Sequence, residues 1–280
     1  MRVREANATL KFLPSLFEDR YDPPTLLHCF VIGGPFVKTL LAKYFLMYMC
    51  LSAGAIMAFP LNDACVHANF AEVKRLVLAG ERVNRINSQG FTPLLSALSG
   101  FSDTTDPTRL DVINFLLEHG ATPDNGIGSV DSPLRYAASN NSRAKAIKLL
   151  VSHGAHVDAF FGKWTALHVA IANNFLDCAR ELLAIGANPN AATQDGSHRT
   201  PLHFSAGAFA SQGLPATKLL LSAGANPWIP DGSGHFPITK AIENHDYDVV
   251  TALSTHGIPP EATESDGMSP FLSAAKAADI

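Results

Sequence analysis

The stretch WTALHVAIANNFLDCARELLAIGANPN, residues 164–190, has the pattern of two short helices joined by a turn. Thr165 is suited to cap the first helix, because its hydroxyl can accept a hydrogen bond from a backbone N–H of the first turn. Apolar side chains follow at the spacing of one buried helical face: Leu167, Ala170 and Ile171. This face predicts that a second helix packs against the first.

Asn173 and Asn174 are expected to end the first helix, since asparagine tolerates the left-handed backbone conformation. The second helix is predicted from Leu176 to Ala184. It stops before Gly186, a residue type that is common just after a helix because φ is often positive there. Two such short helices have too little core to be stable alone. The stretch therefore predicts a stack of similar units.

The same pattern recurs along the chain, with successive spacings of 33, 40, 33, 35, 36 and 33 residues. One proline, or its substitute, begins each first helix: Pro60, Pro93, Pro133, Ala166, Pro201, Pro237 and Pro270. Proline suits this place because the N–H that it lacks would have no helical partner. A glycine ends the second helix of the first six units: Gly80, Gly120, Gly154, Gly186, Gly224 and Gly257. These two markers predict an all-α solenoid over residues 57–280.

A repeat of this length with a T-P-L-H-x-A core resembles the ankyrin repeat, and residues 57–280 resemble an ankyrin-repeat protein. The predicted units are helix–turn–helix elements joined by turn or β-finger loops, at about 57–86, 87–126, 127–159, 160–194, 195–230 and 231–263, with a partial unit at 264–280. The resemblance implies that Thr165 hydrogen-bonds to His168, and Thr200 to His203, tying each turn to its helix. It implies a structural role for the other motif residues as well: Pro93, Pro133, Pro201, Gly120, Gly154, Gly186 and Gly224.

The stretch RTPLHFSAG, residues 199–207, raises the alternative of a catalytic serine and histidine. His203 and Ser205 are residue types used in nucleophilic catalysis. The same core recurs in other units, however, and residues two positions apart on a helix do not face each other. The sequence also contains no metalloprotease, P-loop or α/β-hydrolase motif. We therefore expect no catalytic residue, no cofactor and no metal site, and we expect that the chain is not an enzyme.

The composition argues against a nucleic-acid partner. Of the 280 residues, 16% are charged, the formal net charge is −4, and no lysine or arginine cluster is dense enough to follow a phosphate backbone. The cysteines show no CxxC spacing. Cys65 and Cys178 are expected to stay unpaired, because three predicted layers of about 10 Å each separate them. The polar stretch NHDYD, residues 244–248, is interpreted as helix capping rather than as a metal site.

Residues 1–56 do not join the repeat. An uncharged run from Tyr44 to Asn62 follows Lys38 and Lys43 and contains the small-residue stretch Ala53-Gly54-Ala55. This order is typical of a secretory signal peptide, and the length also suits a membrane helix. A segment at about 37–58 is therefore expected to export or anchor the protein. The alternatives are translation from Met57, which predicts a cytoplasmic protein, and a helix buried in the domain.

Ankyrin-repeat proteins are binding scaffolds, so the resemblance implies a non-catalytic protein–protein interaction scaffold. The partner is an unknown protein, expected at the turn tips and on the adjoining concave face of the first helices, and the chain is expected to be a monomer. The alternative is an exported or membrane-tethered ankyrin protein that acts as an inhibitor, chaperone or effector.

Six residues in the predicted turns are candidates for partner binding: Phe91, Phe161, Trp164, Arg199, Trp228 and His235. Aromatic residues commonly dominate the energy of protein interfaces, and Trp228 replaces the short polar residue found at its place in other units. For each candidate the alternative is packing against the turn of a neighbouring unit. The insertion from Gly100 to Leu110 is a second candidate surface, because insertions in solenoids often lie on a binding face.

Overall fold

The computed structural model describes residues 59–100, 107–124, 131–207, 213–256, 263–264, 267–270 and 272, all within a compact unit from Phe59 to Ile280. The described helices form six pairs, which we number units one to six: α4 (Pro60–Val66) and α5 (Phe70–Leu78), α6 (Pro93–Ser99) and α7 (Pro107–Glu118), α8 (Pro133–Ala138) and α9 (Ala144–Ser152), α10 (Ala166–Ala172) and α11 (Leu176–Ala184), α12 (Pro201–Ala206) and α13 (Gly213–Ser222), and α14 (Pro237–Glu243) and α15 (Tyr247–Ser254). A 3-10 turn, η1 (Asn141–Arg143), lies between α8 and α9.

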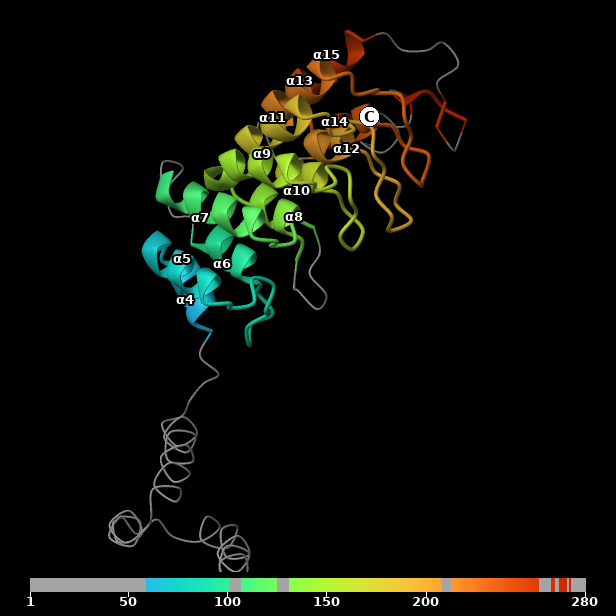
Figure 1. The fold of residues 1–280 in the computed structure, drawn as a ribbon. Coiled ribbons are helices and arrows are strands. Elements are labelled where there is room, and N and C mark those ends of the chain that lie inside the picture. Colours follow the sequence, from blue (N-terminus) through green and yellow to red (C-terminus); the bar gives the residue numbers. More distant parts are fainter. Residues whose placement is uncertain are drawn as a thin grey trace, which may run out of the picture. The chain divides into compact units, whose positions relative to one another are not determined.

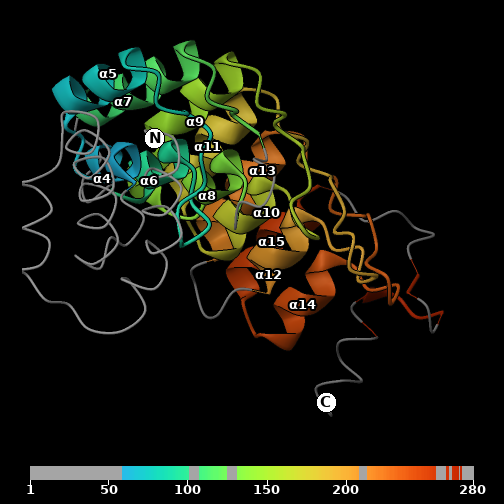
Figure 2. The same cartoon turned by 60° about the horizontal axis from the view of Figure 1, so that its bottom comes forward.

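The pairs stack into two parallel rows of helices. Each first helix contacts the first helix of the next unit, from α4 to α14, and the second helices do the same from α5 to α15. Figures 1 and 2 show both rows, with the loops before the first helices projecting to one side; we call these loops fingers. The core fills the space between the rows, and its largest fully buried side chains include Leu95, Leu150, Leu167, Leu182 and Leu202.

The local signals in the sequence produce the predicted helices. The Thr165 hydroxyl caps α10 by accepting the His168 N–H, and α11 spans the predicted residues Leu176–Ala184. Asn174 adopts a positive φ of 56° between the two helices, and Gly186 has a φ of 94° after the second. An all-α fold is therefore confirmed for the described residues, in which the Phe161–Trp164 bridge is an isolated pairing outside any strand.

Buried histidines connect successive units. Nδ1 of His168 accepts the Thr165 backbone N–H at 3.3 Å, while Nε2 lies 3.1 Å from the carbonyl oxygen of Arg199 in the next unit. His203 repeats this arrangement with Thr200, at 3.1 Å, and with the His235 carbonyl, at 3.1 Å. Because a backbone N–H only donates, Nδ1 is unprotonated and Nε2–H donates to the carbonyl. The predicted Thr–His contacts are confirmed, and they extend to the next unit.

Asn62 makes the same link from the equivalent position of unit one. Its Nδ2 donates to the Phe91 carbonyl at 3.0 Å and to Ser96 Oγ at 2.9 Å. At the equivalent position of unit six, the Thr239 hydroxyl donates to the buried carboxylate of Glu264. A first-helix side chain thus reaches forward along the stack at several layers, although its chemical type changes.

The turns after the second helices form a further ladder between units. A side-chain oxygen four residues after a glycine marker accepts the backbone N–H two residues after the next marker. The four pairs are Asn84 with Thr122 at 2.9 Å, Asp124 with His156 at 3.1 Å, Asp158 with Asn188 at 2.9 Å and Asn190 with Asn226 at 2.7 Å. These bonds fix the position of each finger relative to the one before it.

Arg109 joins units one and two at the ends of their first helices. Its Nη1 donates to the carbonyls of Cys65, Val66 and Ala97 at 3.3, 2.9 and 3.0 Å. Cations are favourable at helix C-termini, where the last carbonyls lack helical partners. This close approach requires a glycine at Gly100, because a Cβ there would lie 2.2 Å from the Val66 carbonyl oxygen and 2.2 Å from Arg109 Nη1.

Several predicted features lie outside the described residues. These are the candidate export or anchor segment at 37–58, the centre of the Gly100–Leu110 insertion, and most of the terminal half unit. Within the part that the structure describes, no helix combines the length and apolar character needed to cross a membrane. Cys65 and Cys178 are both buried and free, which confirms that they do not pair.

Replacing Gly100 with alanine should destabilise the stack, because the new Cβ displaces Arg109 from three buried carbonyls. We expect a loss of about 1–3 kcal/mol in the free energy of unfolding, measured by urea denaturation. Gly207→Ala is the matched control, since Gly207 ends α12 as Gly100 ends α6, and its Cβ would meet only backbone oxygens of its own helix, the nearer at 3.1 Å. Equal losses in the two variants would contradict the Arg109 argument.

Stability should fall as the pH drops below about 6.5. Burial lowers the pKa of His168 and of His203 below the usual 6.5. Above pH 6.5 both histidines are neutral whether folded or unfolded, so the links are intact. As the pH falls from there toward the lower folded pKa, the unfolded chain binds protons first and unfolding becomes easier.

The His168→Asn variant tests this assignment, because Asn62 shows that an asparagine at this position can donate to the forward carbonyl. Thermal unfolding between pH 7.5 and pH 5 should show a smaller loss of stability in His168→Asn than in the parent chain. His168→Ala should be less stable than His168→Asn at pH 7.5, since it removes the donor. If the parent chain and His168→Asn lose the same stability as the pH falls, the pH dependence does not arise from His168.

Candidate binding surface

The structure separates the serine and histidine that raised the catalytic alternative. Ser205 Oγ donates to the Leu202 carbonyl at 3.1 Å and accepts from Thr217 Oγ1 at 2.9 Å, and all three groups are buried. Both ring nitrogens of His203 are occupied, Nδ1 by Thr200 of its own unit and Nε2 by the His235 carbonyl of the next unit. Each side chain therefore has a packing role, and the two do not form a nucleophile–base pair.

Two other reactive residue types are also held in structural roles. Burial raises the pKa of the Cys65 and Cys178 thiols to about 12, so both stay protonated at neutral pH. Cys178 Sγ donates to the Asn140 carbonyl at 3.3 Å. In the NHDYD stretch, Asp246 caps α15 by accepting the Val249 N–H at 3.1 Å, which confirms the capping interpretation. The described residues contain no group of three or more His, Cys, Asp or Glu side chains suited to a metal ion.

The fingers and first helices share one surface, which we call the finger face. It is built from two equivalent positions in each unit, counted from the residue that caps the first helix. The residue before the cap is Phe91, Asp131, Trp164, Arg199 or His235 in units two to six. The residue four positions after the cap is Ser96, Tyr136, Val169, Phe204 or Lys240. Each finger residue therefore lies at the base of its finger, beside the first-helix row.

Two aromatic pairs stand on the finger face, and each pair joins neighbouring units. The Phe91 ring meets the Tyr136 ring of the next unit edge to face, with centroids 5.7 Å apart and planes at 71°. Trp164 meets Phe204 in the same way, at 4.8 Å and 69°. All four side chains are half-buried, so each ring is held by its partner while part of it stays exposed to solvent.

Smaller residues occupy the layers on either side of the Phe91–Tyr136 pair. Val169 is 5% exposed and Ser96 is 1% exposed, so neither projects from the first-helix row. Asp131 and Val169 belong to the layer between the two aromatic pairs. There the Asp131 carboxylate pairs with the Arg135 guanidinium at 2.6 and 2.7 Å. Burial is the largest influence on Asp131 and raises the pKa of its carboxyl. The finger face thus alternates between projecting aromatic pairs and a lower layer.

The polar end of the finger face lies at units five and six. Arg199 is exposed, and its Nε lies 4.0 Å from the buried carboxylate of Asp231; His235 Nδ1 lies 3.9 Å from the same carboxylate. Asp231 Oδ1 accepts the backbone N–H groups of Ser233 and His235 at 2.8 and 3.0 Å. The carboxylate is therefore directed into the finger, while the Arg199 side chain extends outward.

Phe161 lies in the same finger as Trp164, and the Arg135 guanidinium sits 5.1 Å from the centre of its ring. Trp228 lies farther along, in the finger of unit six, where it packs on Phe236 with centroids 5.9 Å apart. The Trp228 Nε1–H is buried and has no hydrogen-bond partner in the described part of the chain. Contacts with a neighbouring unit are therefore observed for Phe91, Phe161 and Trp164, whereas Trp228 packs on the residue that caps the first helix after its own finger.

Sequence reasoning did not identify Tyr136 and Phe204 as site residues. Both occupy the position four residues after the helix cap, so the register of the repeat contained the necessary signal. The contacts themselves required the structure, because they form between units and not within one. The candidates Phe91, Trp164, Arg199 and His235 do share one surface, at the equivalent finger position of successive units.

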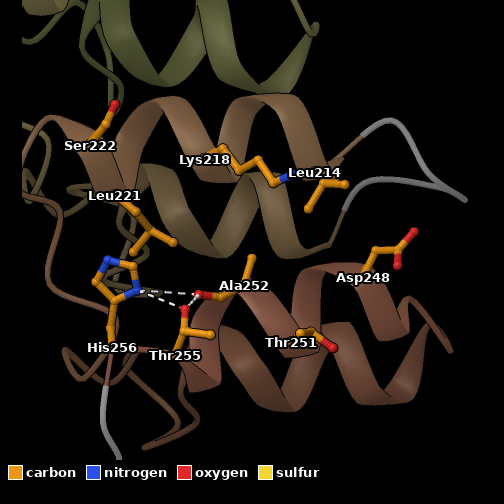
Figure 3. A pocket seen from close by; sticks show the side chains of 9 residues that line it. All are labelled: Leu214, Lys218, Leu221, Ser222, Asp248, Thr251, Ala252, Thr255 and His256. Carbon is orange, nitrogen blue, oxygen red and sulfur yellow. Dashed lines mark hydrogen bonds between the residues drawn. The ribbon is translucent and has the colours of Figure 1, made fainter.

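A second surface feature is an open groove of about 510 Å3 between the second helices α13 and α15. Leu214, Leu221 and Ala252 supply apolar lining, and Figure 3 shows His256 beside Leu221 at one end and Asp248 at the other. His256 Nδ1 is bound locally to the Ala252 carbonyl at 3.2 Å. The polar groups of the groove do not converge on one point, so the finger face is the better candidate site.

The chain resembles known proteins over most of its described part. A family model described as ankyrin repeats (3 copies) matches residues 108–193 and 134–229. Ankyrin repeat and SOCS box protein 16 from Homo sapiens is 34% identical over 197 residues, which are 65% of this chain and 40% of that protein. The B-cell lymphoma 3 protein homolog from Mus musculus is 28% identical over 242 residues, 72% of this chain and 52% of that protein. This chain thus spans about half the length of these relatives or less.

Solved structures show the same fold. The ankyrin repeat domain of Bcl-3 superposes with a TM-score of 0.66 at 23% identity, covering 76% of this chain and 92% of that domain. An ankyrin repeat domain from Acinetobacter baumannii gives a TM-score of 0.60 at 25% identity, covering 71% and 98%. The paired helices, the buried Thr–His links and these matches agree, and this chain belongs to the ankyrin-repeat proteins.

Proposed function

We propose that this protein is a non-catalytic scaffold that binds a protein partner on its finger face. The observation that carries the proposal is the set of partly exposed aromatic rings, Phe91 with Tyr136 and Trp164 with Phe204, held edge to face between units. Aromatic side chains bury a large area for a small loss of rotamer freedom. Rings that are already fixed by a neighbour lose even less on binding.

The polar groups near these rings support a protein partner. Arg199 and His235 occupy the finger position in the two units that follow Trp164, so they can supply hydrogen bonds at the rim of an aromatic contact. Interfaces are typically arranged in this way, with aromatic anchors at the centre and polar groups around them. The hydrogen-bonded links between units use the backbone carbonyls of Phe91, Arg199 and His235, so the side chains of these residues can still take part in recognition.

Truncation of one aromatic pair should weaken partner capture without unfolding the stack. We expect Trp164→Ala to lower affinity for the captured partner on the order of thirtyfold, since loss of an aromatic anchor commonly costs about 2 kcal/mol or more. Phe204→Ala should act in the same direction. The measurement is capture by the immobilised full chain, followed by titration of the identified partner against each variant with circular dichroism as the check on folding.

Leu78→Ala is the control, because Leu78 is a large exposed apolar residue on the second helix of unit one, away from the fingers. It should bind as the parent does. Trp228→Ala tests whether the finger of unit six also takes part. Unchanged capture by folded Trp164→Ala and Phe204→Ala would exclude the finger face as the binding site. The Gly100–Leu110 insertion would then be the next candidate surface.

The place where the scaffold acts is a separate proposal. The uncharged run from Tyr44 to Asn62 supports export or membrane attachment through residues 37–58. Sequencing the first residues of the protein purified from its native cells, together with its distribution between soluble and membrane fractions, tests this. A mature chain that begins at Met57 in the soluble cytoplasmic fraction would contradict it.

A further inference from the structure

The two aromatic pairs of the finger face are separated by two layers of the stack. Phe91 and Tyr136 span units two and three, and Trp164 and Phe204 span units four and five. Packed helices lie about 8–10 Å apart, so equivalent points two layers apart are about 16–20 Å apart. Between them lies the lower layer that contains Val169, which is 5% exposed. A ligand that runs along the stack therefore contacts two projecting aromatic pairs, and the surface between the pairs is lower.

A polyproline II helix matches this interval. It has three residues per turn and rises about 3.1 Å per residue, so residues i and i+6 lie on the same side and about 19 Å apart. Proline rings pack well on aromatic side chains, and the conformation is already extended before binding, which reduces the entropy lost. An α-helix would cover the same distance with about 12 residues, but it would present a broad side-chain surface rather than two narrow contacts.

The polar groups around the aromatic pairs favour a ligand rich in carbonyl oxygens. The carboxylates here are already used: Asp131 binds Arg135, and Asp195 accepts from Ser197 and Thr193. The exposed side chains beside the Trp164–Phe204 pair include two donors, the Lys163 ammonium and the Arg199 guanidinium. A polyproline II segment offers fully solvated carbonyls and few N–H groups, so its hydrogen-bonding groups complement this surface.

We propose that the finger face of units two to five binds a proline-rich segment of a partner protein in the polyproline II conformation. Prolines six residues apart pack on the Phe91–Tyr136 pair and on the Trp164–Phe204 pair, and ligand carbonyls accept from the Lys163 ammonium and the Arg199 guanidinium. This inference rests on the proposed function and adds the chemical class of the bound segment. It predicts a nearly uncharged core in the ligand, because Asp131 and Arg135 neutralise each other in the layer between the pairs.

The first experiment is a peptide array probed with the full chain. One set of 12-residue peptides carries proline at positions i and i+6 with the other positions varied, and a matched set carries alanine at both positions. The proline set should be enriched among the bound peptides, and the best peptide should bind Trp164→Ala and Tyr136→Ala at least tenfold more weakly than the parent chain. Leu78→Ala should bind it unchanged. No preference for the proline set would overturn the inference.

The second experiment uses the fact that the chain contains only two tryptophans. In Trp228→Phe, Trp164 is the sole tryptophan, and titration with the best array peptide should shift its emission to shorter wavelength as the ring is desolvated. In Trp164→Phe, the remaining Trp228 should show no shift, because it lies in the finger of unit six. A shift of Trp228 alone would place the peptide elsewhere and contradict the inference.

The two proposals fail in different ways. If a protein partner is captured through Trp164 and Phe204 but its bound segment contains no proline pair, the scaffold proposal holds and the polyproline II inference is wrong. If captured partners are unaffected by every finger-face variant, the scaffold site itself is wrong. Cross-linking of the partner complex followed by mass spectrometry identifies the bound segment and decides between these results.

Discussion

One acceptor recurs at three junctions of the stack: the carbonyl oxygen of the residue just before the cap of a first helix. It receives a hydrogen bond from the previous unit, from His168 at Arg199, from His203 at His235 and from Asn62 at Phe91. A buried carbonyl without a donor costs about 1–3 kcal/mol, so each bond resists separation of neighbouring layers. The same residue carries a finger-face side chain. The interaction that holds the units together therefore also positions the surface proposed to bind a partner.

Sequence patterns predicted what lies within one unit, and the structure added what lies between units. The α10 cap, the bounds of α11 and the positive φ of Gly186 follow from residues close in the chain. The Phe91–Tyr136 contact joins residues in different units, across an insertion whose length no local rule fixes. Arg109 was equally hidden, because its three carbonyl partners belong to two helices that only stacking brings together. Four of the six candidate residues shared the register of one surface, but their first-helix partners were missed.

Trp228 shows that a departure from the repeat pattern can have a structural reason instead of a role in binding. In four earlier units, the equivalent residue is an Asn or Asp that accepts the N–H two residues after the next glycine marker. Counting from Gly257, the corresponding donor position for Trp228 is Pro259, which has no N–H. An acceptor at residue 228 would have no donor at that position, so an aromatic side chain that packs on Phe236 is compatible with the end of the ladder. Its presence therefore needs no partner, in contrast to the exposed edges of Trp164 and Phe204.

The aromatic pairs combine stability and recognition in one contact. Each ring rests on a ring of the next unit, so the stack gains packing energy from the pair and the pair gains rigidity from the stack. Free side chains at the same positions would have to be ordered when a partner binds, at a cost of about 0.5–1.5 kcal/mol for each flexible side chain. A repeat scaffold avoids that cost by spreading its fixed contacts over several layers. For this reason a surface built between units, rather than on a single finger, is the part of this fold best suited to hold an extended ligand.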